Sequence, residues 1–178
     1  LTQDECTALN DWVNFGVKKK YLDLGFSGSK FVENRLTTRM YGHRFQYPET
    51  VAFVAKKIAQ LVGNLDIVDG HGRDGVVVSC TFDGGDVYEH KDPRAADGRA
   101  TLRCNVVTQR PESGGDLYVG GQHIDIEAGD LHCYLASEHE HYVTPVRGQT
   151  PRILWMFGGH VQADAWNSKQ IGANLGVS

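Results

Sequence analysis

Hydrophobic residues recur at helical intervals in two stretches of the first third of the chain. The first stretch opens with the capping-box sequence of residues 2–5 and continues with apolar Cys6, Leu9 and Val13. This spacing places the three apolar side chains on one helical face. We therefore expect a helix over about residues 3–14, with that face packed against a sheet.

The second stretch has the clearer helical pattern. Pro48 lies near its start, and Gly63 provides a stop signal at its end. Between them one apolar stripe contains Val51, Val54, Ala55, Ile58, Leu61 and Val62. We expect this helix, like the first, to pack against a sheet.

From residue 75 onward the pattern changes to short apolar runs separated by Gly, Pro and Asp turns. Eight such runs are expected to be strands: residues 76–82, 87–90, 101–107, 117–119, 123–126, 131–136, 141–146 and 152–157. Short strands of this kind are typical of an all-β sandwich or barrel, and eight of them fit a jelly roll.

The segment from Asp23 to Gln46 shows no sustained period and is rich in Gly, Ser, Arg and aromatic residues. It is either a surface connection or a lid over a site, because long loops in compact domains often cover sites. The pattern leaves both interpretations open. Its candidate functional side chains are Arg35, Arg39, Tyr41, His43 and Arg44.

The length of 178 residues suits one domain with a sizeable core. We expect a single domain over residues 1–178, mainly β with flanking helices. In it, about residues 1–74 supply helical support and a candidate lid, and about residues 75–158 form the β core. The sequence does not indicate an oligomeric state.

Composition narrows the function classes. Hydrophobic residues make up 40% of the chain and charged residues 22%, which is ordinary for a soluble globular protein. No apolar run approaches the roughly 20 residues of a membrane span. The net charge of -4 gives no global attraction to phosphate backbones, so nucleic-acid binding is disfavoured. The 4 cysteines show no C-x-x-C spacing, which favours an intracellular, reducing compartment, cytoplasmic or otherwise.

A candidate metal site combines His90 and Asp92 with a histidine about fifty residues later, His141. On a strand, residues two apart point the same way, so His90 and Asp92 can contact one ion while Glu89 and Lys91 face outward. Two imidazoles and one carboxylate are the ligand set of non-haem Fe(II) oxygenases, which leaves metal positions open for other ligands. The pattern therefore predicts an iron site.

Five short segments extend this pattern in a fixed order: residues 88–92, 114–119, 126–131, 141–146 and 151–155. They resemble the H-x-D, GG-x-x-x-[FV], P-x-x-G-[DR] and H-x-V-x-P-V motifs, and the basic residue before an apolar strand, of the 2-oxoglutarate/Fe(II)-dependent dioxygenases. The prolyl-4-hydroxylase-like branch is the most similar. The resemblance covers roughly residues 75–158 and implies a double-stranded β-helix (jelly roll) backed by N-terminal helices.

The resemblance also implies the ligands and their residues. It gives Fe(II) bound by His90, Asp92 and His141, with 2-oxoglutarate and O2 as cosubstrates and ascorbate as a candidate reductant. His132 and His139 are rivals of His141, but the H-x-V-x-P-V context belongs to His141 alone.

Arg152, before the apolar run 153–157, is the candidate anchor for the distal carboxylate of 2-oxoglutarate. A guanidinium offers a fixed fork of donors to a carboxylate. Its rival, Arg147, lies in a turn-like sequence. Thr81 stands where the family usually has the tyrosine of a Y-x-x-G segment, so we expect Thr81 at the second contact to the cosubstrate. Val87 replaces an aromatic residue often found before the first histidine.

The implied reaction couples oxidative decarboxylation of 2-oxoglutarate to hydroxylation of an unactivated C–H bond. In related halogenases a small residue replaces the carboxylate ligand, so Asp92 favours hydroxylation. A free amino acid or similar small molecule is the first substrate hypothesis, because no peptide-binding module is appended. A prolyl residue in a peptide is second and a nucleobase third. Arginines left open as contacts to a substrate carboxylate are Arg35, Arg39, Arg94, Arg99 and Arg103.

Two alternatives are not enzymes of this kind: a catalytically silent jelly-roll binding module, and a cupin-like metal protein. A cupin normally has two ligands in one H-x-H followed by a Glu. The H-x-H at residues 139–141 comes at the end of the β region without that Glu, which disfavours the cupin.

Overall fold

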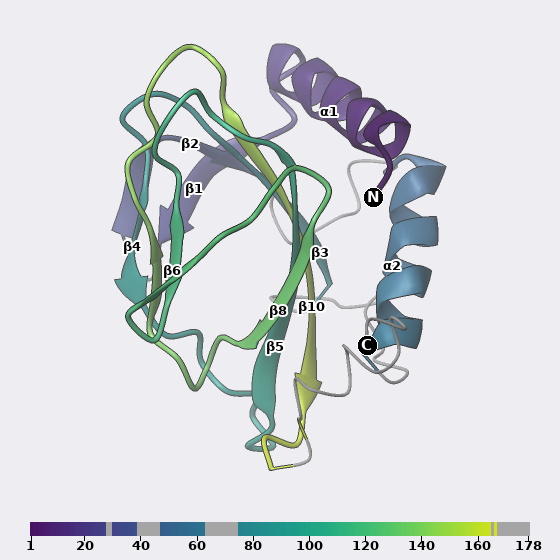
Figure 1. The fold of residues 1–178 in the computed structure, drawn as a ribbon, viewed down its shortest axis with the longest axis vertical. Coiled ribbons are helices and arrows are strands. Elements are labelled where there is room, and N and C mark those ends of the chain that lie inside the picture. The colour runs from purple at the N-terminus through teal and green to yellow at the C-terminus, as the bar shows by residue number, and fades with distance from the viewer. Residues whose placement is uncertain (28–29, 39–46, 63–74, 165, 167–178) are drawn as a thin grey trace.

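Two antiparallel sheets face each other, and two helices cover the outer face of the larger one (Figure 1). The computed structural model describes residues 1–27, 30–38, 47–62, 75–164 and 166. The larger sheet has the order β1 (Asp23–Ser27), β2 (Lys30–Thr37), β3 (Val76–Thr81), β10 (Arg152–Val161), β5 (Ala100–Gln109) and β8 (Leu131–Leu135). The smaller has the order β4 (Val87–His90), β9 (His141–Val143), β6 (Leu117–Val119) and β7 (Gln122–Ile124). This is the expected jelly roll with N-terminal helices.

Helix α1 (Gln3–Lys18) begins at the predicted capping box. The Thr2 hydroxyl accepts a hydrogen bond from the Glu5 backbone N–H at 3.2 Å, and the Thr2 backbone N–H donates to the Glu5 carboxylate at 2.8 Å. The helix extends to Lys18, past its predicted end near residue 14, and Gly16 lies in its last part as a buried packing residue. A Cβ at Gly16 would lie 2.9 Å from Cδ1 of Leu22.

Helix α2 (Glu49–Leu61) starts after Pro48 and ends at a C-cap on Val62, which confirms the second predicted helix. Gly63, the predicted stop, lies outside the described residues. Neither α1 nor α2 combines the length and apolar character of a membrane-crossing helix within the described chain.

The main core lies between the helices and the outer face of the six-stranded sheet. Trp155 and Phe157 on β10 are fully buried there with Leu9 of α1 and Val54 of α2. Side chains on β10 alternate, so Arg152, Leu154 and Met156 point to the opposite, inner face. A second, smaller cluster fills part of the space between the sheets: Val107, Leu117, Ile126, Val143 and Leu154.

All eight predicted strands are present: β4 and β6 have the predicted bounds, and the other six have shifted ends. The strand predicted at residues 141–146 is β9, which ends at Val143. Pro145 lacks a backbone N–H and cannot continue a ladder, which explains the early end. All four cysteines are free thiols, as expected for a reducing compartment, although the compartment itself stays a prediction.

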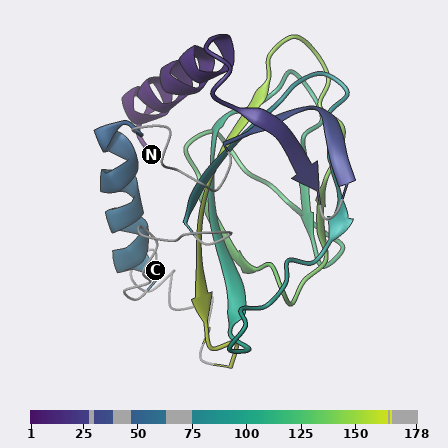
Figure 2. The same ribbon diagram turned by 180° about the vertical axis from the view of Figure 1, so that it is seen from behind.

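The segment expected to be a surface connection or a lid is instead a β-hairpin over its described part. Strands β1 and β2 pair with each other, and β2 pairs with β3, so the hairpin extends the large sheet. Figure 2 shows it on the side that carries β4, which β1 contacts. The sequence of β1 and β2 did not show the alternation of apolar and polar residues typical of a strand, because apolar Leu24 is 56% exposed while charged Arg35 is 7% exposed. Residues 39–46 lie outside the described residues.

Candidate metal centre

His90, Asp92 and His141 come together between the two sheets. Each offers one ligand atom, and these atoms all lie within 4.8 Å of one another. His90 ends β4 and His141 begins β9, where the two residues are direct cross-strand partners. Their ring centroids are 4.4 Å apart. Strand pairing therefore brings together two histidines that are fifty residues apart in sequence.

Both imidazole rings are oriented by backbone carbonyl groups. His90 Nδ1 lies 2.7 Å from the Tyr88 carbonyl oxygen, and His141 Nδ1 lies 3.1 Å from the His139 carbonyl oxygen. In the tautomer with the proton on Nδ1, each ring donates to its carbonyl and turns the Nε2 lone pair toward the centre. Such hydrogen bonds fix the tautomer and orientation of metal-binding histidines.

Arg103 of β5 holds the carboxylate of Asp92. Its Nε donates to Asp92 Oδ2 at 2.8 Å, while the other oxygen, Oδ1, lies 3.7 Å from His90 Nε2. Burial raises the pKa of Asp92, but the charge and hydrogen bond of Arg103, with smaller effects of His141 and His90, outweigh burial. The pKa therefore lies below its usual value and the carboxylate is ionised at neutral pH.

His141 is suited to bind a metal in its neutral form. Burial lowers its pKa below the usual value, and His90 and Arg103 act in the same direction against the opposing effects of the His139 carbonyl and Asp92. Tyr134 of β8 packs edge-on against the ring, with centroids 5.1 Å apart. A neutral imidazole is the metal-binding form of histidine.

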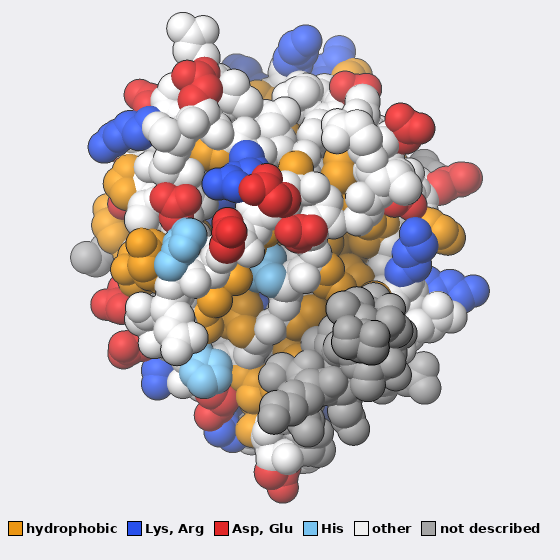
Figure 3. All heavy atoms as spheres, viewed as in Figure 1, with side chains coloured by type: hydrophobic (Ala, Val, Ile, Leu, Met, Phe, Trp, Pro, Cys, Tyr) orange, Lys and Arg blue, Asp and Glu red, His pale blue; other side chains and the backbone are white. Residues whose placement is uncertain are grey.

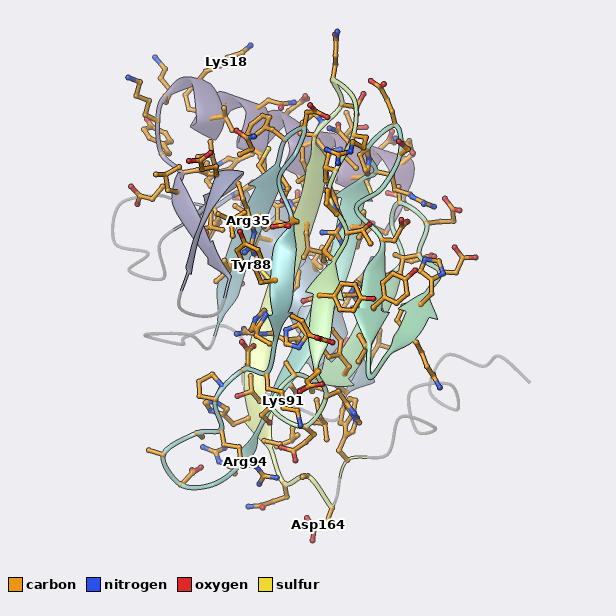
Figure 4. All side chains as sticks on the ribbon, turned by 90° about the vertical axis from the view of Figure 1, so that its left-hand side faces the viewer. Lys18, Arg35, Tyr88, Lys91, Arg94 and Asp164 are labelled. Carbon is orange, nitrogen blue, oxygen red and sulfur yellow. The ribbon has the colours of Figure 1, made fainter. Side chains whose placement is uncertain are left out.

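The donor set of two oriented imidazoles and one ionised carboxylate fits Fe(II) or a similar divalent metal. Glu89 and Lys91 are exposed, as the strand parity predicted, and Lys91 is labelled just beyond the end of β4 in Figure 4. The side chain of the rival His139 is exposed, and its backbone carbonyl group orients the His141 ring instead. His132, the other rival, lies on β8 outside the group, and both its ring nitrogens are buried without a hydrogen-bond partner.

A polar interior continues from these residues toward the start of β10. Arg152 is 4% exposed and Thr81 is 3% exposed, and the two are cross-strand partners. Gly115 adopts a φ of +70°, and a Cβ there would lie 2.9 Å from Arg152 Cδ. The glycine therefore allows the backbone to approach the arginine stem closely. Arg147, the rival of Arg152, is exposed.

The arginines left open in the sequence have different surroundings. Arg94 pairs with Glu138 at 2.6 Å and Arg99 with Asp97 at 2.8 Å, both near the surface. Arg103 pairs with Asp92, and Arg35 is buried on β2. Arg39 lies outside the described residues.

The sequence did not indicate that Arg103 orients Asp92 or that Tyr134 packs on His141. Strand parity could have supplied the first signal, because Arg103 shares the inner face of β5 with Asn105 and Val107. A charged residue at an inward position of an apolar strand needs a buried partner.

A cavity of about 250 Å³ opens beside Asp92. It is lined by Asp92, Pro93, Arg94, Ala95, Ala96, Thr101, Arg103 and His160. It is separate from Arg152, which is absent from its lining. A small molecule in this cavity would lie next to the Asp92 carboxylate.

Neither a protein-family model nor the sequence of a curated protein matches the chain. Solved structures that share its fold include three prolyl hydroxylases. A Pseudomonas putida prolyl-4-hydroxylase has a TM-score of 0.64 and 18% identity, with 91% of this chain and 88% of that chain covered. A Trichoplax adhaerens prolyl hydroxylase in complex with a hypoxia inducible factor peptide fragment has a TM-score of 0.62 and 16% identity, with 96% of this chain and 81% of that chain covered. The viral collagen prolyl hydroxylase of Paramecium Bursaria Chlorella virus-1 has a TM-score of 0.55 and 19% identity, with 90% of this chain and 87% of that chain covered. The chain therefore has the jelly-roll fold of the prolyl hydroxylases, as its motifs implied.

Proposed function

We propose that this protein is a non-haem Fe(II)/2-oxoglutarate-dependent dioxygenase that hydroxylates an unactivated C–H bond of a small molecule. The observation that carries the proposal is the convergence of His90, Asp92 and His141, with both imidazoles oriented through Nδ1 and the carboxylate held by Arg103. This arrangement lies in a fold shared with three prolyl hydroxylases.

In this proposal His90, Asp92 and His141 hold the iron. A bound Fe(II) would supply the oxygen-activating chemistry that side chains lack, with O2 and 2-oxoglutarate as the co-reactants. Ascorbate is a candidate reductant for the iron. The protein contributes an ionised Asp92, whose charge offsets that of the metal, and a neutral His141.

Arg152 is the proposed anchor for the distal carboxylate of 2-oxoglutarate, with Thr81 beside it. Its guanidinium is buried, and no carboxylate of the described residues forms an ion pair with it. Burial and the nearby Arg35 lower the pKa of Arg152 to about 10, so it stays charged at neutral pH. A buried cation without a carboxylate partner is costly, and a dicarboxylate cosubstrate would supply that partner.

A free amino acid or related metabolite is the substrate class that the cavity beside Asp92 fits best. Its volume of about 250 Å³ lies below the roughly 300–1,000 Å³ of pockets for drug-sized ligands. A prolyl residue in a peptide is the second candidate, because one structural neighbour was solved with a peptide fragment. A nucleobase is third. Basic and acidic side chains are interspersed on the face in Figure 3, with no continuous basic field for phosphates.

Anaerobic spectroscopy tests the proposal directly. The purified protein should bind one Fe(II) per chain, and 2-oxoglutarate should then produce a weak visible charge-transfer band. Succinate release should rise when the right class is added from a panel of amino acids, Pro-containing peptides and nucleosides. A protein that binds no iron would exclude the proposal and leave the silent binding module. Stimulation by peptides or oligonucleotides alone would reverse the substrate ranking.

A further inference from the structure

Cys104 of β5 and Cys133 of β8 lie directly opposite each other on adjacent antiparallel strands. Both are free thiols, and β8 is the last strand of the large sheet (Figure 1). Cys104 is fully buried, whereas Cys133 is half-buried. A hydrogen bond joins the two thiol groups, so their sulfur atoms are already neighbours. This dithiol is separate from the ligand atoms of the candidate metal centre.

The position of the dithiol in the ladder suits a disulfide bond. Opposite residues of an antiparallel ladder alternate between hydrogen-bonded and non-hydrogen-bonded pairs. The backbone N–H of Ala136 donates to the Thr101 carbonyl group at 2.8 Å, so these two residues are a hydrogen-bonded pair. Three steps along the ladder, Cys104 and Cys133 are therefore a non-hydrogen-bonded pair, whose Cα atoms lie about 4.5 Å apart. Disulfides span Cα distances of about 4.4–6.8 Å, which places the two cysteines within bonding range.

The other two cysteines, which also lie in the described part of the chain, do not have this arrangement. Cys80 is on β3, and β10 separates β3 from β5. Two strand spacings amount to about 9–10 Å, which is beyond the reach of a disulfide. Cys6 is outside the sheet on α1, where a Cβ at Gly129 would lie 3.7 Å from its Sγ atom. Among the four thiols, the sheet therefore pairs only those of β5 and β8.

The dithiol adjoins two residues that contact the candidate metal centre. Arg103 and Tyr134 are the next cross-strand pair of the same ladder. Their side chains point to the opposite face of the sheet, because successive residues of a strand alternate. There Arg103 donates to Asp92, and Tyr134 packs on His141. A shift of β8 against β5 would therefore reach two of the three candidate ligands.

A disulfide bond would produce such a shift. Directly opposite Cβ atoms in an antiparallel pair are about 4.5–5.5 Å apart, whereas those joined by a disulfide are about 3.5–4.5 Å apart. Bond formation thus draws the two strands together by about 1 Å at the cysteines. The backbone of Arg103 and Tyr134 follows, since each residue is covalently attached to a cysteine of the pair.

We propose that Cys104 and Cys133 are a redox-modification site, at which hydrogen peroxide forms a disulfide bond that displaces Arg103 and Tyr134 and weakens metal binding. The cross-link itself is independent of the proposed function, and only its effect on iron rests on that function. Two thiols and one peroxide give one disulfide and two waters. The sulfur atoms are oxidised by two electrons in total, and the peroxide is reduced by the same two electrons.

The more exposed Cys133 takes the first step. Its thiolate attacks one peroxide oxygen and the O–O bond breaks, which leaves a sulfenic acid and a hydroxide that takes up the thiol proton as water. The hydrogen bond to Cys133 and burial raise the pKa of Cys104, so Cys104 stays a protonated thiol and reacts second. Its sulfur then attacks the Cys133 sulfur, the S–O bond breaks, and the hydroxyl group leaves with the Cys104 proton as the second water.

Peroxide treatment of the reduced, metal-free full chain tests the site. The proteins are the wild type, Cys104→Ala, Cys133→Ala and the control Cys80→Ala, which removes a buried thiol from β3. After removal of the peroxide, intact mass and peptide mapping should show loss of two hydrogen atoms and a link between residues 104 and 133 in the wild type and in the control. Neither variant of the pair should form this link, and dithiothreitol should reverse it.

Anaerobic Fe(II) titration of the same samples tests the coupling. Oxidation should weaken iron binding by the wild type and by Cys80→Ala at least about tenfold, the lower limit for losing a residue that orients a metal ligand. Dithiothreitol should restore the affinity. Peroxide should leave the affinity of Cys133→Ala within about threefold of its reduced value, and this half-buried position is the safer of the two to truncate.

Four results would contradict parts of this inference. Sulfinic acid at Cys133 without a cross-link, or a cross-link through Cys6 or Cys80, would overturn the assigned site. A link between residues 104 and 133 with unchanged iron affinity would refute the coupling to the metal centre. An equal loss of affinity in oxidised Cys133→Ala would assign the effect to another oxidised residue. Absence of iron binding in the reduced wild type would contradict the proposed function and the coupling, whereas peptide mapping would still decide the cross-link.

Discussion

Replacing Arg103 should weaken metal binding even though Arg103 is not a ligand. Its Nε donates to Asp92 Oδ2 at 2.8 Å, and the two side chains are 12% and 16% exposed. Arg103→Met keeps the length of the stem and removes the charge and the hydrogen bond. The carboxylate then loses the group that orients it and that keeps it ionised.

The magnitude follows from two effects of this contact. Loss of a partner that orients a metal ligand typically costs about 10–100-fold in metal affinity, or about 1.4–2.7 kcal/mol. The metal-free protein also loses stability, because a nearly buried carboxylate is left without its cation. That loss should lie at or below the low end of the about 3–5 kcal/mol measured for fully buried pairs, since both side chains retain some exposure.

The pH dependence of iron affinity gives a more specific test of the role of Arg103. Asp92 has a pKa below its usual value, so in the wild type its ionised pair with Arg103 stabilises the fold above that usual value. This contribution is lost as the pH falls through the lowered pKa. Without Arg103, burial remains and raises the pKa of Asp92. Protons then compete with the metal at higher pH, so iron affinity in Arg103→Met should decline at a higher pH than in the wild type.

The assay is an anaerobic Fe(II) titration between pH 5 and 8, roughly the range in which histidine and a raised carboxyl pKa titrate, with thermal unfolding of the metal-free proteins. The matched control is Arg99→Met, because Arg99 Nε lies 2.8 Å from Asp97 Oδ2 in an exposed pair. Its iron affinity should equal that of the wild type. The iron affinity of Arg103→Lys should lie between those of Arg103→Met and the wild type, since lysine keeps the positive charge. Wild-type iron affinity for Arg103→Met at every pH would refute the assigned role of Arg103.

Three further substitutions, two of them paired with a control variant, test the remaining site. Arg152→Gln should raise the KM for 2-oxoglutarate more than about tenfold in a succinate-release assay, whereas the exposed Arg147→Gln should not; the reverse order would mean that the anchor is misassigned. Asp92→Ala should weaken iron binding, as measured by metal analysis, and abolish hydroxylation, while Glu89→Ala on the outer side should leave turnover within about threefold; iron loss in the latter would move the ligand assignment. Gly115→Ala should lower the Tm, at a cost of about 1–2 kcal/mol for its positive φ, and weaken 2-oxoglutarate through displacement of Arg152; unaltered calorimetric binding would argue against that contact.

The sequence predicted the elements whose signals are local. The two helices showed an apolar stripe and start or stop residues, and the strands after residue 75 were marked by apolar runs between turns. The metal-binding hypothesis also used local information, because His90 and Asp92 share strand parity. The structure then brought His141 to the same place by pairing β9 with β4.

The features that the sequence did not predict depend on long-range pairing. The hairpin of β1 and β2 was missed because its buried and exposed residues contradict their usual preferences, with Arg35 inside and Leu24 outside. The position of Arg35 is set by pairing with Thr81, 46 residues away, and no local pattern contains that register. Strand parity can place Arg103 on the inner face of β5, but only the assembled sheets show that its partner there is Asp92.

The alternation along β10 makes this strand intolerant of insertions and deletions. Its even-numbered residues, from Arg152 to Met156, face the space between the two sheets, whereas Trp155 and Phe157 face the helices. A one-residue deletion between Pro151 and Ile153 would shift the register and exchange the two faces. An apolar side chain would then occupy the position of the Arg152 guanidinium. Because β10 pairs with both β3 and β5, a shift of one neighbouring strand alone could not restore the register. We therefore expect length changes in this lineage to accumulate in loops such as residues 94–99, and homologues to keep β10 at constant length.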